Sequence, residues 1–128
     1  IEKEINEFNP GLVVTHNPVE VNIDHIITFK AVEAALRPTN NKVKPAIWGC
    51  EIPCSGRWTL ENKFVPNYFV DTQKYQKKKF LLLDQYRLEM KKPPHPRSVV
   101  NINALSIYRG GIVGLKHAEA FYVNKIIN

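Results

Sequence analysis

Hydrophobic and polar residues alternate along several short segments of the chain. Successive side chains of a strand point to opposite faces, so a period of two predicts a strand with one buried face. Nine prolines and six glycines are spread along the chain, and they predict turns between the alternating segments. The pattern predicts strands over residues 19–29, 46–52, 58–64, 86–91 and 100–108.

Two segments also fit helices. Residues 29–36 consist mostly of good helix formers and stop at Arg37-Pro38. Residues 72–92 fit a helix capped by Asp71 and closed by Pro93-Pro94 as well as they fit a hairpin. We therefore predict a β-dominated fold, a small antiparallel sandwich or barrel with one or two short helices, and an α+β fold is the alternative.

The length of 128 residues predicts a single domain over residues 1–128. The chain begins with Ile1 rather than methionine, so we expect it to be part of a longer protein, with residues 1–10 as a flexible N-terminal arm. Its 44% hydrophobic and 23% charged residues exclude a disordered chain. No apolar run approaches the roughly 20 residues of a membrane helix, so we expect no membrane span.

The net charge of +6 arises from one stretch of the sequence. Residues 74–97 hold eight basic and two acidic side chains, whereas the remainder is balanced. Localised positive charge attracts polyanions by releasing their counterions. Aromatic side chains among the lysines suit stacking with bases, and the polar neighbours of Tyr75 predict that it is the most exposed of them. The predicted nucleic-acid-binding residues are Lys74, Tyr75, Lys77, Lys78, Lys79, Arg87, Lys91, Lys92 and Arg97.

These features favour a non-enzymatic domain that binds nucleic-acid phosphates with low sequence selectivity, and they indicate no catalytic residue. A solvated lysine-rich edge and an acidic protein or membrane partner are other interpretations of the same charge. A second hypothesis is a structural or assembly subunit, for instance of a viral particle or secretion machinery, that associates with itself or with a protein partner.

A third hypothesis is a metal-dependent nuclease. Glu89-Met90-Lys91 has the E-x-K form that offers a carboxylate to Mg²⁺ and an ammonium to the scissile phosphate. Asp71 or Asp84 would supply the second carboxylate.

The two cysteines, Cys50 and Cys54, are too few for a disulfide framework, and this favours a reducing, intracellular compartment. Together with His95 and His117 they are the candidate zinc ligands, but they lack the paired spacing of a structural site. We predict no metal and no cofactor.

Overall fold

More residues lie in helices than in strands in the computed structural model, which describes residues 1–38 and 43–126. The chain is 42% helix and 18% strand, with four α-helices and a four-stranded mixed sheet among the described residues. It is an α+β fold, so the prediction of a β-dominated sandwich or barrel is wrong. The strand order in the sheet is β1 (Leu12–His16), β2 (Ala46–Cys50), β4 (Ala118–Lys125) and β3 (Tyr68–Asp71). The residues group into two compact units, 1–67 with 121–128, and 68–120.

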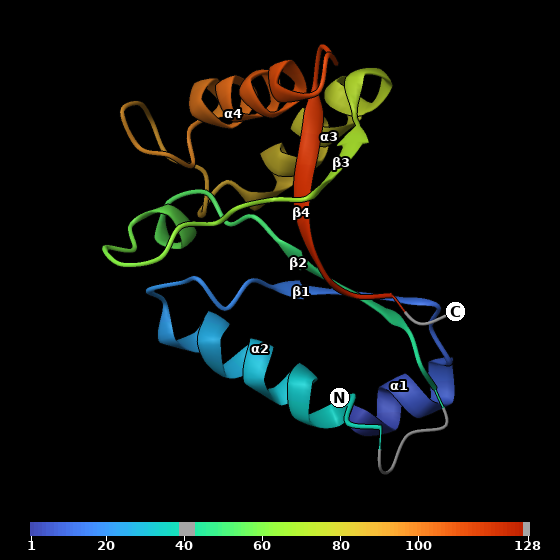
Figure 1. Cartoon of the computed structure of the whole chain (residues 1–128). Coiled ribbons are helices and arrows are strands. Elements are labelled where there is room, and N and C mark those ends of the chain that lie inside the picture. The colour runs from blue at the N-terminus through green and yellow to red at the C-terminus, as the bar shows by residue number, and fades with distance from the viewer. Residues whose placement is uncertain (39–42, 127–128) are drawn as a thin grey trace. The chain divides into compact units, whose positions relative to one another are not determined.

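The first unit is built on a β-α-β element. Strand β1 (Leu12–His16) leads into helix α2 (Ile23–Ala35) and then into strand β2 (Ala46–Cys50), which pairs parallel to β1 from Leu12↔Ala46 to His16↔Cys50. Figure 1 shows α2 running alongside the two strands. Parallel strands need such a crossover, and it brings their carboxyl ends to one edge of the sheet. His16 and Cys50 therefore end their strands side by side.

Two further pieces complete this unit. Helix α1 (Glu2–Phe8) occupies most of the segment expected to be a flexible arm and buries Ile5. Strand β4 (Ala118–Lys125) pairs antiparallel to β2, with Cys50 opposite Phe121. A 3₁₀ turn, η1 (Ser55–Arg57), follows β2.

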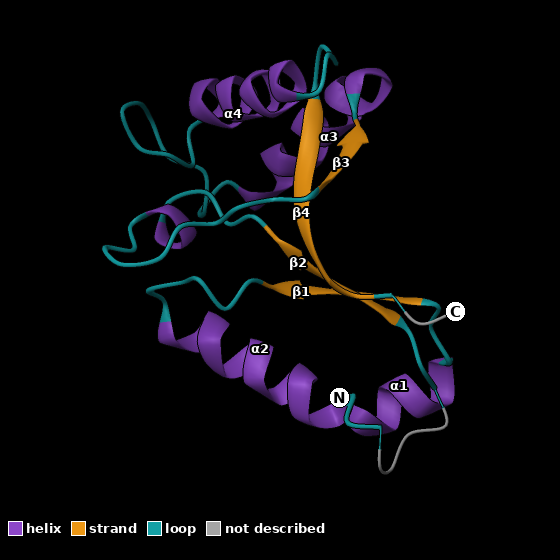
Figure 2. Cartoon of the chain, in the orientation of Figure 1, coloured by secondary structure: helices purple, strands orange, loops and turns teal. Residues whose placement is uncertain are grey.

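The second unit contains strand β3 (Tyr68–Asp71), the 3₁₀ turn η2 (Gln73–Tyr75), helix α3 (Gln76–Leu83), the 3₁₀ turn η3 (Asp84–Tyr86), helix α4 (Val99–Ile112) and the first residues of β4. Figure 2 shows the helices of this unit in purple. Gln76 on α3 donates a hydrogen bond to Ser106 on α4 at 3.1 Å, and Ser106 Oγ lies 3.3 Å from His117 Nδ1. These polar contacts tie α3, α4 and the approach to β4 together.

The structure contradicts the predicted strands over residues 19–29 and 100–108, because both segments lie largely in helices. Asn22 caps α2 by accepting a hydrogen bond from Asp24 N, and Ser98 caps α4 by accepting one from Asn101 N. The buried residues of α4 recur at helical spacing, which local alternation concealed: Ile102, Ser106, Arg109 and Gly110. Short apolar runs satisfy both periods, and the capping side chains decide between them.

The other predicted elements have mixed outcomes. The strand over 46–52 is confirmed as β2. The helix over 29–36 is confirmed as the second half of α2, which ends at Ala35, two residues before Arg37-Pro38. Residues 58–64 and 86–91 form no strand, and 72–92 is a short helix flanked by 3₁₀ turns rather than one helix or a hairpin. No helix among the described residues is long and apolar enough to cross a membrane.

Gly110 on α4 provides a direct test of the packing in the second unit. A Cβ atom there would lie 2.6 Å from Leu115 O and 2.9 Å from His117 N, whereas a Cβ at Gly111 would meet nothing within 4 Å. We expect Gly110→Ala to lower the free energy of unfolding by about 1–3 kcal/mol, because backbone must move aside. Gly111→Ala, the matched control, should raise it by about 0.5–1 kcal/mol by favouring the helix. Urea denaturation measures both, and equal effects would contradict this packing.

Candidate functional site

A buried carboxylate lies just beyond the end of β1, in the loop of residues 17–22 that leads into α2. The Glu20 side chain is 1% exposed. Its Oε1 accepts hydrogen bonds from Val21 N at 2.8 Å and from Asn22 N at 3.0 Å, and its Oε2 lies 2.8 Å from His25 Nδ1. One side chain therefore organises the loop, the start of α2 and the first turn of that helix.

The environment of Glu20 keeps it ionised. Burial raises its pKa, but hydrogen bonds from the His25 ring, two backbone N–H groups and the Ser55 side chain outweigh burial, so the pKa lies below its ordinary value. An ionised carboxylate only accepts hydrogen bonds, so His25 Nδ1 carries the hydrogen that lies between the two side chains. The result is a Glu–His pair of the kind that orients a general base.

A second histidine stacks on this pair. The rings of His16 and His25 have centroids 4.3 Å apart and planes inclined by 17°. Within the described part of the chain, His16 Nδ1 is buried and has no hydrogen-bond partner. Burial lowers the pKa of His16, as does the proximity of His25, while Glu20 acts in the opposite direction. His16 is therefore a neutral ring at neutral pH.

A cleft of about 330 Å³ adjoins this cluster, lined by residues 18–21 on one side and 59–62 on the other. Four of its lining residues carry polar side chains, and they are Glu20, Thr59, Glu61 and Asn62. The second wall is braced internally, because the Thr59 hydroxyl donates to Asn62 O and Lys63 Nζ donates to Thr59 O at 2.6 Å. The cleft lies within the first unit and presents hydrogen-bonding groups to a small polar molecule.

Metal ligands do not gather in the described residues: within 1–38 and 43–126, no group of three or more His, Cys, Asp or Glu side chains is arranged to hold an ion. Within the described part of the chain, neither Cys50 nor Cys54 belongs to a disulfide bond. Glu89, at the E-x-K motif, instead forms an ion pair with Arg97.

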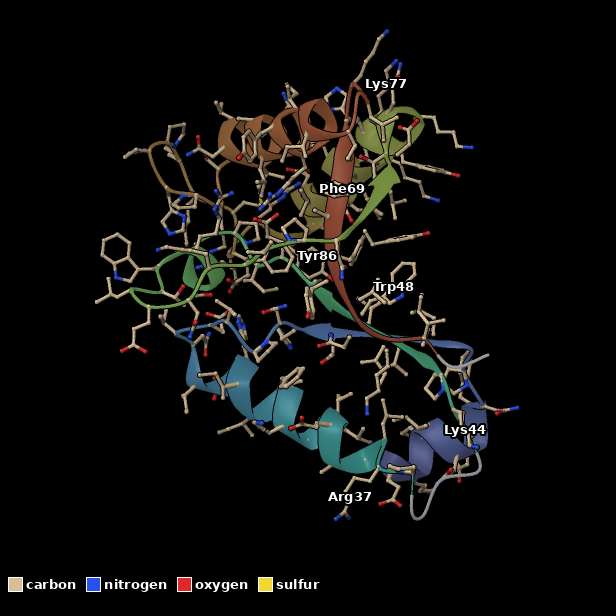
Figure 3. The ribbon with its side chains drawn as sticks, viewed as in Figure 1. Arg37, Lys44, Trp48, Phe69, Lys77 and Tyr86 are labelled. Atoms are coloured by element: carbon tan, nitrogen blue, oxygen red, sulfur yellow. The ribbon has the colours of Figure 1, made fainter. Side chains whose placement is uncertain are left out.

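The predicted nucleic-acid-binding residues all fall in the second unit. Tyr75, Lys78 and Lys79 line one cleft of about 400 Å³, together with Glu119. Lys77 extends outward from α3 (Figure 3), and Lys74 lies over the Tyr75 ring at 5.2 Å from its centroid. The remaining predicted residues belong to the segment between η3 and α4, and they are Arg87, Lys91, Lys92 and Arg97.

Acidic partners neutralise part of this charge. Lys79 pairs with Glu119 at 2.6 Å, Arg87 with Asp84 at 3.4 Å, and Arg97 with Glu89. Tyr75, at 52% exposure, is less exposed than Tyr86 at 65%, so the prediction that Tyr75 is the most exposed of the aromatics is wrong.

The cluster of Glu20, His25 and His16 was missed by sequence reasoning. A strand over 19–29 would place Glu20 and His25 on opposite faces, whereas the loop and the helix bring them together. The usable signal was Asn22 followed by Asp24, a helix start that would have placed His25 in a first turn.

The sequence matches no protein-family model and no curated protein sequence. Solved structures share its fold. The conserved protein TT1542 of Thermus thermophilus superposes with a TM-score of 0.73 at 15% identity, over 99% of this chain and 57% of that chain. The N,N'-diacetylchitobiose deacetylase of Pyrococcus horikoshii, in complex with its inhibitor MPG, gives 0.67 at 19% identity, over 95% and 48%. This chain thus spans about half the length of each.

A fold shared with a deacetylase contradicts the prediction of a non-enzymatic nucleic-acid-binding domain. The likeness also lends no support to a viral or assembly protein or to a nuclease. The prediction rested on the basic stretch of residues 74–97, and the Glu20 cluster, outside that stretch, is the better candidate site.

His16 gives this site a pH signature. Its pKa in the folded protein lies below the ordinary value of 6.5, so the unfolded chain binds the proton more readily. The contribution of this pKa difference to the free energy of unfolding is fully present above pH 6.5. It declines as the pH falls from 6.5 toward the pKa of His16 in the folded protein. Glu20 adds a further decline only below its ordinary value of 4.5. Urea unfolding at about pH 7.5, 6.5 and 5.5 should show a shallower loss of stability in His16→Gln than in the wild type, and identical slopes would contradict the burial of a neutral His16.

Proposed function

We propose that the protein is a hydrolase that removes an acyl group from an amide, with an N-acetylated amino sugar as the substrate class. The observation that carries the proposal is the Glu20–His25 hydrogen bond of 2.8 Å at the carboxyl edge of β1 and β2. Ligands of open α/β sheets bind outside the carboxyl ends of the strands. A neighbour in fold acts on diacetylchitobiose, which supports this substrate class.

His25 acts as the base in the proposed reaction. With its Nδ1 hydrogen donated to Glu20, its Nε2 carries the lone pair and takes a proton from a water molecule. The water oxygen forms a bond to the amide carbonyl carbon. His25 Nε2 then returns the proton to the amide nitrogen, the C–N bond breaks, and the products are the carboxylic acid and the free amine. Glu20 stays ionised and stabilises the positive ring that forms between the two transfers.

The cleft beside Glu20 suits a sugar. Hydroxyl groups of a sugar both donate and accept hydrogen bonds. The cleft offers acceptors in Glu61 and Thr59, and the side chain of Asn62 can both donate and accept. Trp58 precedes this wall and is 75% exposed, which makes its ring available for contact with an apolar sugar face.

The test is release of acetate from N,N'-diacetylchitobiose by the wild type and two variants. Glu20→Gln leaves one acceptor oxygen for both the backbone N–H groups and the ring, and His25→Gln removes the base. We expect each to lower kcat at least a hundredfold, the lower end of what general base catalysis contributes, about 10²–10⁴-fold.

The matched control is Glu33→Gln. Glu33 also lies on helix α2, but its side chain is exposed and pairs with Lys30 at 2.8 Å. This variant should keep the wild-type rate. No acetate release by the wild type, or equal rates for Glu20→Gln and Glu33→Gln in folded protein, would reject the proposed reaction.

A further inference from the structure

Asn22 links the cap of helix α2 to the ring of His25. Its Oδ1 accepts a hydrogen bond from Asp24 N at 3.0 Å, which is the N-cap contact of the helix. Its Nδ2 lies 3.4 Å from His25 Nε2. The oxygen of the Asn22 amide therefore contacts the backbone of the first helical turn, and its nitrogen contacts the His25 ring in the same turn.

The cap fixes which end of the amide faces the ring. A backbone N–H requires an acceptor, so the Asn22 oxygen must point to Asp24 N and the NH₂ group must point to His25. Glu20 adds a second restraint, because its Oε1 accepts from Asn22 N at 3.0 Å and holds the backbone of the capping residue. The amide cannot turn over without losing the cap.

An NH₂ group only donates hydrogen bonds, so the nitrogen of His25 that faces it must be an acceptor. Nε2 therefore carries a lone pair and no hydrogen. The contact at the other nitrogen gives the same answer independently, because the Glu20 carboxylate accepts and Nδ1 must donate at 2.8 Å. A proton on Nε2 would place two donors against each other.

We infer that Asn22 is a positioning residue that, with Glu20, holds His25 in the Nδ1–H tautomer and keeps Nε2 as the free basic nitrogen. The catalytic use of that nitrogen rests on the proposed function, but the tautomer itself does not. At 3.4 Å the Asn22 contact is long enough to leave the lone pair open to a closer partner such as water.

The test exchanges the amide and the carboxylate within the cap. The double variant Asn22→Asp/Asp24→Asn keeps the number of charges and keeps an N-cap oxygen, since Asp caps as well as Asn. It replaces the NH₂ group at Nε2 by a carboxylate oxygen, which accepts. Asp24→Asn alone is the matched control, because the capping group at Asp24 is its backbone N–H.

The readout is the ¹⁵N and ¹H NMR spectrum of the His25 ring in protein without substrate, recorded where the ring is neutral and carries one hydrogen. We expect the wild type and Asp24→Asn to carry hydrogen on Nδ1 only, and the double variant to carry hydrogen on Nε2. A purely structural cap would leave the ring unchanged in all three. Hydrogen on Nε2 in the wild type, or an unchanged ring in the double variant, would overturn the inference.

Acetate release separates this inference from the proposed reaction. If both hold, the double variant loses activity at least tenfold while Asp24→Asn keeps it. The expected ring spectra without any acetate release by the wild type would remove the proposed function and leave the positioning role of Asn22 intact.

Discussion

The burial of one carboxylate governs the local structure of the first unit. Burying an ionised group is expensive unless its oxygens are fully hydrogen-bonded, and Glu20 meets that condition with backbone donors on Oε1 and the His25 ring on Oε2. The loop after β1 therefore folds back on itself, and Asn22 caps the start of α2 at Ile23. Because the same carboxylate fixes the loop, the helix start and the ring, a substitution of Glu20 would alter all three together.

The topology explains why this carboxylate lies beside a cleft at the edge of the sheet. The parallel pairing of β1 and β2 brings two strand ends to one edge, and the crossover through α2 returns the chain along the sheet. A strand-to-helix loop at this edge is the usual place for binding residues in α/β folds. Residues 59–62 form the wall of the cleft opposite this loop, so a polar ligand would be held between two segments of the first unit.

Part of this architecture could be predicted from the sequence. Strand β2 followed from alternation, and the second half of α2 followed from its helix formers. The first half of α2 could not be found by counting apolar positions, because Ile23 and Ile27 are exposed at 62% and 58% and fit the pattern of a strand. Asn22 and Ser98, which cap α2 and α4, were the residues that marked the starts of these helices.

The site was missed for the same reason, since Glu20 and His25 come together only when Asn22 caps a helix. The charge of residues 74–97 predicted a binding surface there, but three of its cations are paired with acids. Asp84 and Glu89 of the same stretch pair with Arg87 and Arg97, and Glu119 from outside it pairs with Lys79.

The most direct measurement is an NMR titration of the folded protein with glucosamine disaccharide, the amine product of the proposed reaction. If the cleft beside Glu20 is the ligand site, resonances of the His16 and His25 rings and of residues 59–62 shift together and saturate with one dissociation constant. Shifts confined to residues 68–120, or none at all, would contradict the assignment of this cleft as the functional site.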